Sequence, residues 1–221
     1  MPTSELTKTD ATTVRRKAER ADYRRDTANA ILDEALVAHV GFSVDEQPFV
    51  IPMVFGRDGD RLILHGSAAS RLLRALDDGV PVCVTVTLID ALVAARSQFH
   101  TSMNYRSVVI IGVARRIRDL DDARRAMARV VDHALPGRSV EARPPTDAEL
   151  RQTAVLELPI DTASVKTRTG GPVEDPDDLA LPVWGGIVPV TTAFGTPQPD
   201  DDLRADVKVP TELEDYRRPG S

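Results

Sequence analysis

The sequence predicts an α+β fold, mainly antiparallel β, in which a β-barrel carries peripheral helices. Three apolar runs follow one another across very short polar links, so they must pair as antiparallel neighbours. They span His39–Val44, Pro48–Phe55 and Arg61–His65. Helical patterns are inserted among about seven such runs instead of alternating with them, which excludes a doubly wound parallel sheet and favours a barrel.

The chain begins with a polar arm, residues 1–24, which lacks periodic apolar residues and is expected to be extended or partly disordered. Asp26 then suits a helix cap. Apolar residues such as Ala30 and Ile31 recur at helical spacing and predict the first helix over Thr27–Val37.

The links between the three strands predict tight turns. They are Asp45–Gln47 and Arg57–Asp60, and the second contains the Asp-Gly pair typical of hairpins. A helix over residues 68–77 follows, and Gly79 closes it. Pro81–Ile89 is rich in β-branched residues and predicts a strand, after which Asp90 is expected to turn the chain.

The second half of the barrel region repeats this mixture. The longest predicted strand is Ser107–Ile117, and a helix over Leu120–Leu135 ends at Pro136-Gly137. Thr146 and Glu149 have the spacing of a capping box and predict a second, short helix. The closing strands are predicted at Val155–Ile160 and Ala163–Arg168.

Three parts result: the arm (1–24), the barrel domain (25–170) and a C-terminal extension (171–221). The extension is rich in Pro, Gly and Asp, and only Leu179–Val190 is apolar enough to pack. We expect it to lie on the barrel or on a partner subunit.

Composition narrows the classes of partner. The formal net charge is −6 with a pI near 5.3, and no basic block stands out, so nucleic acid is not expected as a partner. No apolar run has signal-peptide or membrane-spanning length. Cys83 is the only cysteine; it lies in an apolar run and is expected to be an inert core thiol in a reduced compartment. The protein is expected to be cytoplasmic, with no membrane association.

The strand-to-helix turn at residues 65–71 predicts a phosphate site. Gly66 and Ser67 break the strand, Ser70 offers a hydroxyl donor, and Arg71 a planar guanidinium that can bind phosphate bidentately. The alternative is an ordinary capped helix with a solvated Arg71.

Other sites are less distinct. The histidines are His39, His65, His100 and His133; they lack the spacing of zinc ligands. No nucleophile elbow, Walker loop or dinucleotide fingerprint is present. The polar segment Ser97–Ser107 is either a ligand-facing segment or a solvated loop.

These runs together resemble the pyridoxamine 5′-phosphate oxidase-like family, and within it the flavin-nucleotide-binding branch akin to nitroimidazole-resistance proteins. The resemblance covers about residues 25–190 and rests chiefly on LILHGSAASRLLRAL, MNYRSVVIIG and LPVWGGIVP. It implies a split β-barrel that forms a homodimer and binds FMN at the subunit interface.

The resemblance also implies cofactor contacts. The flavin ring would lie along strand residues, the phosphate at the turn, and further groups would approach from across the interface and from the extension; in chain order these are Val50, Ile51, Pro52, Met53, His65, Gly66, Ser67, Ser70, Arg71, Tyr105, Arg106, Ser107 and Trp184. Leu72 stands where the oxidase has a basic residue, and the substrate-phosphate residues near the C-terminus have no match, which argues against pyridoxamine phosphate as substrate.

The function expected is that of an FMN-dependent oxidoreductase acting on a small molecule, in which the flavin supplies the redox chemistry. One alternative is a non-catalytic barrel that binds flavin, deazaflavin or haem. Another is a structural dimer without a cofactor.

Overall fold

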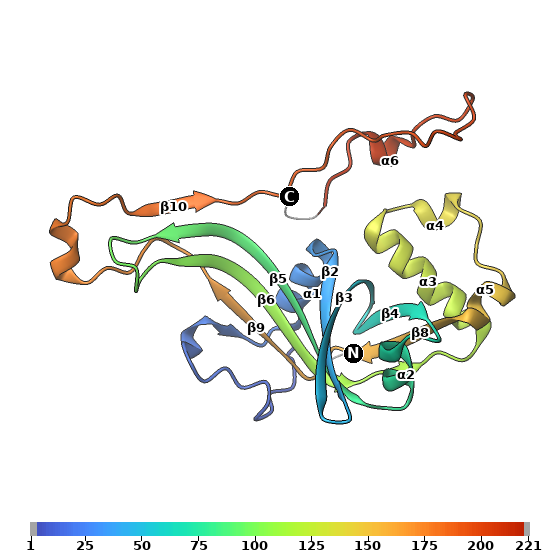
Figure 1. Ribbon diagram of the computed structural model, residues 1–221, viewed down its shortest axis with the longest axis horizontal. Helices are drawn as coiled ribbons and strands as arrows, with labels where there is room; N and C mark the ends of the chain where they lie inside the picture. Colours follow the sequence, from blue (N-terminus) through green and yellow to red (C-terminus); the bar gives the residue numbers. More distant parts are fainter. Residues whose placement is uncertain (1–3, 219–221) are drawn as a thin grey trace.

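The computed structural model describes residues 4–218 and contains one ten-stranded sheet. Its strands are β1 (Ala21–Asp22), β2 (Val37–Val44), β3 (Gln47–Asp58), β4 (Arg61–Ser67), β5 (Pro81–Ala94), β6 (Ser102–Val113), β7 (Arg115–Arg116), β8 (Thr153–Pro159), β9 (Ala163–Arg168) and β10 (Gly186–Pro189). The order is β1-β9-β6-β5-β2-β3-β4-β8-β7, with β10 added to β5, and all pairs are antiparallel. The predicted fold class, an α+β split barrel, is confirmed (Figure 1).

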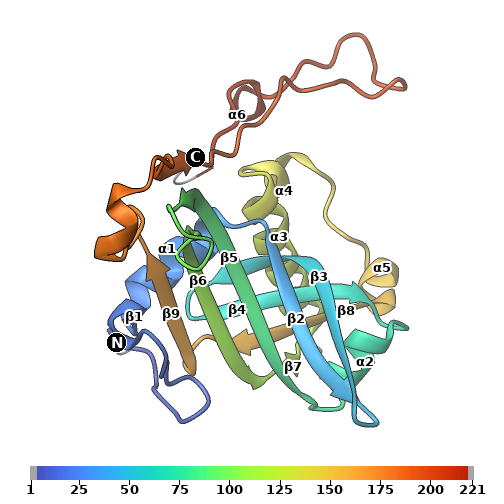
Figure 2. The same cartoon turned by 60° about the vertical axis from the view of Figure 1, so that its left-hand side comes forward.

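The barrel is divided because β3 serves two neighbours in turn. Its first part pairs with β2, from Gln47 to Val54, and its last part pairs with β4, from Phe55 to Asp58. Figure 2 shows β3 passing from one set of strands to the other. Both links predicted from the sequence are therefore hairpins.

The β2–β3 turn has an uncommon backbone. Asp45 and Glu46 have φ values of 50° and 62°. Two successive left-handed residues are typical of a type I′ turn, whose twist matches that of the flanking strands. The pairing on either side starts directly at Val44 and Gln47.

Within residues 4–218, six α-helices lie outside the sheet. They are α1 (Arg25–Glu34), α2 (Arg71–Asp77), α3 (Leu120–Ala134), α4 (Arg138–Glu141), α5 (Asp147–Gln152) and α6 (Thr211–Glu214), with 3₁₀ turns η1 (Ala18–Arg20) and η2 (Pro176–Ala180). The predicted capping box is present at α5: the Thr146 hydroxyl accepts from the Glu149 backbone N–H, and the Glu149 carboxylate accepts from that of Thr146.

Two apolar clusters hold these layers together. The larger one fills the barrel and receives Ile31 and Leu32 from α1 and Leu76 from α2. The smaller one lies between β4 and β8 on one side and α3 and α5 on the other, and includes Ile63 and Val130. At Gly56 the two layers approach so closely that a Cβ would lie 2.9 Å from backbone atoms of Val130.

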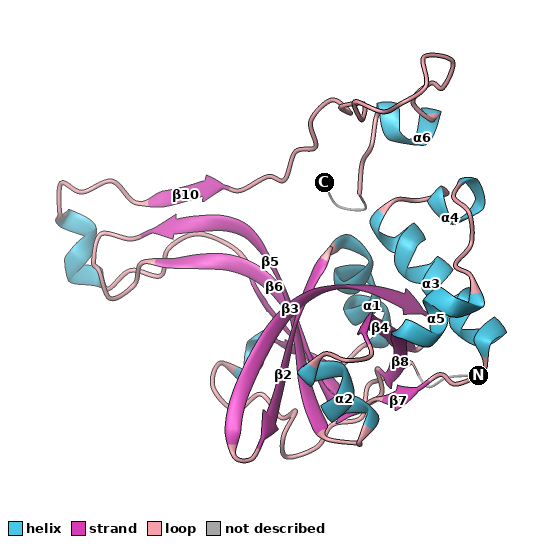
Figure 3. Ribbon diagram, turned by 45° about the vertical axis from the view of Figure 1, so that its right-hand side comes forward, coloured by secondary structure: helices cyan, strands magenta, loops and turns pink. Residues whose placement is uncertain are grey.

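A long β-ribbon projects from the barrel. The outer ends of β5 and β6 extend away from it, and β10 pairs with β5 there, from Gly186 opposite Ala94 to Pro189 opposite Ala91 (Figures 1 and 3). The sequence predicted a turn at Asp90 and a strand that starts only at Ser107. Both predictions are wrong, because Asp90 sits at an irregularity within β5 and β6 already begins at Ser102.

Three further predictions are wrong, and they concern the bounds of the first helix, the burial of Cys83 and the loose N-terminal arm. The first helix starts at Arg25 and ends at Glu34, since Val37 is taken into the sheet opposite Val54. Cys83 is exposed, because the alternation of β5 turns Val82 and Val84 inward.

The described part of the N-terminal arm, residues 4–24, is packed instead of extended and loose. Leu6 is buried, and its backbone N–H donates to the Tyr23 carbonyl. The Thr12 side chain is also buried, and Lys166 of β9 donates to the Arg16 carbonyl.

The end of the described chain returns to the barrel. Arg218 is buried and donates to the carbonyls of Asp33, Glu34 and Ala35 at the end of α1, and to that of His133 in α3. The last carbonyls of a helix have no partner within the helix, so one guanidinium completes the ends of two helices.

Candidate functional site

Six of the residues predicted to hold the flavin line one pocket between β3 and α2. This β3–α2 pocket has a volume of about 440 Å³, in the range typical of cofactor sites. Its lining is Phe42, Phe49, Ile51, Met53, Gly66, Ser67, Ser70, Arg71, Leu72 and Leu73. It is apolar apart from two serines and one arginine.

Arg71 is the cation of this pocket. Its guanidinium carbon lies 4.6 Å from the centre of the Phe49 ring, which in turn stacks on Phe42 at 5.4 Å. Stacking on an aromatic face orders an exposed guanidinium without neutralising it. Arg71 forms no ion pair with any carboxylate of the described residues. The site therefore carries a positive charge next to hydroxyl donors.

The two serines have defined backbone roles. The Ser70 hydroxyl accepts from the Leu73 N–H at 3.2 Å and caps α2, and the Ser67 hydroxyl accepts from the Ala69 N–H at 3.3 Å. Because each hydroxyl oxygen accepts, its proton is available to donate to an anion. At Gly66 a Cβ would lie 3.1 Å from Leu73, so the small residue allows close packing of α2 on β4.

The predicted flavin-ring strand, Val50–Met53, has two faces. Ile51 and Met53 line the β3–α2 pocket. Val50 and Pro52 alternate with them and point to the outer face of the sheet, where Pro52 is paired with His39 of β2. One strand thus serves a pocket on one side and an exposed surface on the other.

A second cavity, the β2–β5 pocket, lies at that outer face and has a volume of about 470 Å³. One wall comes from the α1–β2 link, β2, β5 and β6, and the other from the C-terminal extension; the lining is Glu34, Ala35, Leu36, Val37, His39, Thr87, Leu88, Ile89, Asp90, Arg106, Val190, Thr191, Thr192, Phe194 and Arg218.

Arg106 belongs to this second pocket and not to the first. It donates to Asp90 at 2.7 Å and to Glu34 at 2.8 Å, and these carboxylates raise its pKa. A guanidinium held by two carboxylates has no net charge left for a phosphate. Its neighbours Tyr105 and Ser107 are half-buried on the outer face of β6, and Ser107 donates to the Lys166 carbonyl.

His65 and Trp184 do not line the β3–α2 pocket of their own subunit. Leu62 and Leu64 of β4 join the barrel core and Ile63 joins the α3 cluster, so alternation turns His65 toward the α3 side. Burial lowers the pKa of His65. Trp184 is 65% exposed and lies against Gly186 on the projecting ribbon.

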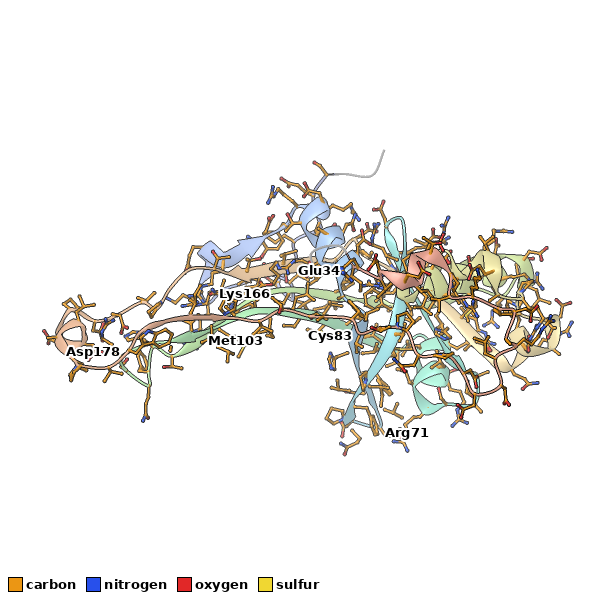
Figure 4. The ribbon with its side chains drawn as sticks, turned by 90° about the horizontal axis from the view of Figure 1, so that it is seen from above. Glu34, Arg71, Cys83, Met103, Lys166 and Asp178 are labelled. Carbon is orange, nitrogen blue, oxygen red and sulfur yellow. The ribbon has the colours of Figure 1, made fainter. Side chains whose placement is uncertain are left out.

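Figure 4 places these regions. Asp178 lies at the outer end of the ribbon, Met103 and Cys83 follow toward the barrel, and Arg71 lies at the barrel itself.

Sequence reasoning missed the aromatic pair Phe42 and Phe49. They pair with each other in the β2–β3 hairpin, and a strand pattern does not show that they reach the predicted phosphate turn. His39 was considered only as a zinc ligand. Among residues 4–218 no three His, Cys, Asp or Glu side chains are grouped to hold a metal ion, and no helix there is long and apolar enough to cross a membrane.

Comparisons with known proteins relate this chain to one protein family. A family model described as pyridoxamine 5′-phosphate oxidase matches residues 24–167. The structure of the flavocytochrome Anf3 from Azotobacter vinelandii is 40% identical, with a TM-score of 0.89, and the match covers 95% of this chain and 97% of that one. No curated protein matches.

Two other solved structures are similar. A FAD and haem binding protein from Mycobacterium smegmatis is 37% identical with a TM-score of 0.84, over 88% of this chain and 95% of that one. A putative 5-nitroimidazole antibiotic resistance protein from Bacteroides thetaiotaomicron is 24% identical with a TM-score of 0.57, over 66% of this chain and 85% of that one, and shares the fold.

Proposed function

The chain belongs to the pyridoxamine 5′-phosphate oxidase family, and we propose on this premise that it is a flavin-binding oxidoreductase whose β3–α2 pocket holds the flavin phosphate. The observation that carries the proposal is Arg71. It is ordered on Phe49, lacks a carboxylate partner among the described residues, and lies with Ser67 and Ser70 on an otherwise apolar pocket.

These groups fit a phosphate on chemical grounds. A guanidinium binds phosphate bidentately, and hydroxyl protons complete the remaining acceptor positions. Ile51, Met53 and Phe49 offer apolar surface for the more hydrophobic part of the nucleotide. Once bound, the flavin supplies the redox chemistry, while the chain binds it, orients it and limits access of water.

FMN is our first candidate, since one cation and two hydroxyls suit a single terminal phosphate. FAD is the second, and it is favoured by the name of the Mycobacterium smegmatis protein. To distinguish FMN from FAD, the bound nucleotide is released by heating and identified by chromatography against both standards.

The same proposal includes a homodimer. The outer face of β2 and β3 exposes Val37 (43%), Val50 (64%) and Val54 (40%), an apolar surface that isolated monomers rarely present. Tyr105 and Ser107 belong to the same face, so in a dimer paired there they would approach the partner's flavin. This would reconcile their predicted role with their distance from their own subunit's pocket.

Haem is a second candidate function. It is favoured by the names of two of the similar structures, a flavocytochrome and a protein that binds FAD and haem. Haem would be a second group beside the flavin, because the β3–α2 pocket contains no histidine.

The first test is an absorbance spectrum of the purified protein with and without added FMN, followed by analytical ultracentrifugation. We expect the oxidised-flavin band and a dimer, and we expect Val50→Lys to give a monomer with weakened flavin binding. A wild-type monomer would exclude the shared interface, and a protein that binds neither FMN nor FAD would refute the proposed function.

A further inference from the structure

The last part of the described chain, residues 190–218, is fastened at its two ends and not in between. We call it the strap. It starts at Val190, whose backbone N–H donates to the Asp90 carbonyl at 2.9 Å. None of the side chains of residues 195–215 is buried, and among residues 4–218 no hydrogen bond or ion pair joins that segment to the barrel. The contacts of its final residues therefore decide where the strap lies.

Two residues at the end of the strap provide these contacts. The Tyr216 hydroxyl donates to the Ala134 carbonyl at 2.6 Å, and its ring packs edge-to-face on Phe194 with centres 4.6 Å apart. Arg218 donates to carbonyls at the ends of α1 and α3, among them that of Ala35 at 3.0 Å. The last carbonyls of a helix carry partial negative charge and attract a cation, which the strap supplies here.

A second group that can become a cation lies at the same carbonyls. His133 Nε2 is 2.7 Å from the Ala35 carbonyl oxygen, which can only accept, so Nε2 carries the proton of the neutral imidazole. Arg218 Nη2, also a donor, lies 3.3 Å from this nitrogen. A neutral imidazole tolerates this neighbour, whereas a protonated one would place two positive charges side by side in a half-buried site.

The other charges around His133 stay with the barrel when the strap leaves. The charged or titratable groups near the imidazole are Asp33 of α1, Arg57 of β3, and Tyr216 and Arg218 of the strap, while the carboxylates of Glu34 and Asp132 bind Arg106 and Ser139. Asp33 and Arg57 bind each other through two contacts of 2.6 Å, so their opposite effects on His133 largely cancel. Burial lowers the pKa of His133, the bond to the Ala35 carbonyl raises it, and the charge of Arg218 lowers it further.

We propose that His133 is an acid-sensitive release for the strap. When the imidazole takes up a proton, it replaces Arg218 as the cation at the helix ends, and the strap swings off the barrel. Phe194 moves with it and leaves the wall of the β2–β5 pocket. In the released state His133 is more solvated and lacks the neighbouring guanidinium, so it binds the proton more tightly than in the closed state. Acid must therefore shift the population toward release.

This inference does not depend on the proposed function. His133, Tyr216 and Arg218 do not line the β3–α2 pocket, so the flavin site can be present or absent without changing the contacts that hold the strap. The device is a two-state element whose equilibrium one titrating group biases.

Spin-label distance measurements across pH test the inference. Arg125→Cys on α3 and Glu212→Cys on α6 carry the labels in a Cys83→Ser chain, because all three positions are exposed. Labelled chains are diluted with unlabelled protein, so that only distances within one chain are read. With His133 intact, one narrow distance at about pH 8 should give way to a growing fraction of longer distances toward about pH 5. His133→Gln keeps a donor for the Ala35 carbonyl but cannot become a cation, so it should stay closed throughout.

Two further variants complete the design. Arg218→Gln should show the longer distances already at about pH 8. His100→Gln changes the histidine that contacts Asp175 on the ribbon, and should follow the chain with all four histidines. Circular dichroism of the same samples separates release from unfolding.

An NMR titration of the imidazole signals decides the question even where acid unfolds the chain. His133 should titrate at higher pH in Arg218→Gln than in the wild type, because the guanidinium no longer opposes its charge. A folded wild type that stays closed to about pH 5, equal release in His133→Gln, or an unshifted His133 titration in Arg218→Gln would overturn the inference.

Discussion

Removing the Arg71 guanidinium should weaken flavin binding without unfolding the protein. In Arg71→Ala the pocket keeps its two serine hydroxyls and its apolar walls but loses its cation. Arg71 forms no ion pair with a described carboxylate, so its removal leaves no unpaired charge behind. The change in flavin affinity should therefore come almost entirely from the lost contact between Arg71 and the ligand.

The magnitude follows from the type of contact. Hydrogen bonds to a charged group contribute about 1.5–3 kcal/mol, which corresponds to a roughly 10- to 150-fold higher Kd for FMN. Phe49→Leu should have a smaller effect, about 0.5–1 kcal/mol, because it removes only the stacking that orders the guanidinium at 4.6 Å. Salt should weaken wild-type binding more than that of Arg71→Ala.

The assay is isothermal titration calorimetry of the flavin-free protein with FMN. Arg74→Ala is the control, because Arg74 lies one turn further along the exposed side of α2 and does not line the pocket. Its Kd should stay within about twofold of the wild type. A Kd for Arg71→Ala equal to that of the wild type, or an equal loss in both variants, would refute the placement of the phosphate.

Three further predictions concern stability. Gly56→Ala should destabilise by roughly 1–3 kcal/mol in urea unfolding, because its Cβ would lie 2.9 Å from the Val130 backbone, whereas Gly171→Ala, with open space around it, should be neutral. Burial lowers the pKa of His133 from its usual 6.5, so the unfolded chain binds the proton more readily than the folded one. The free energy of unfolding should therefore fall as the pH drops below 6.5, and it should fall less steeply in His133→Gln. Chemical unfolding at a series of pH values would measure this. Glu46→Gly should raise Tm, since it removes a left-handed penalty of about 1 kcal/mol; an unchanged or lower Tm would count against the turn geometry.

Local patterns in the sequence predicted much of the fold and part of the candidate site. The hairpins follow from short links such as Arg57–Asp60. The predicted phosphate turn is contiguous from Gly66 to Arg71, so one stretch contains most of its polar groups. The alternation of side chains along β5 also places Cys83 on the outer face, but the apolar run around it suggested that both faces are buried.

The features that the sequence did not predict depend on contacts between elements far apart in the chain. The polar start of β6 is a strand because β5 pairs with it, with Val93 opposite Ser102, and polar residues on an exposed ribbon leave no apolar alternation to recognise. Arg106 has the same chemistry as Arg71, yet Glu34 from α1 neutralises it. Phe49 reaches Arg71 only because the β2–β3 hairpin folds over α2.

The turn at Asp45 and Glu46 holds the register in which β3 pairs with β2. A strand presents alternate residues to opposite sides, so a slip of β3 by one residue against β2 would send Ile51 and Met53 to the outer face and Pro52 into the β3–α2 pocket. A slip of two residues would keep the sides but displace every contact along the strand. A change in the length of this turn therefore preserves the β3–α2 pocket only where the loop absorbs it and leaves the pairing of Val44 with Gln47 unchanged.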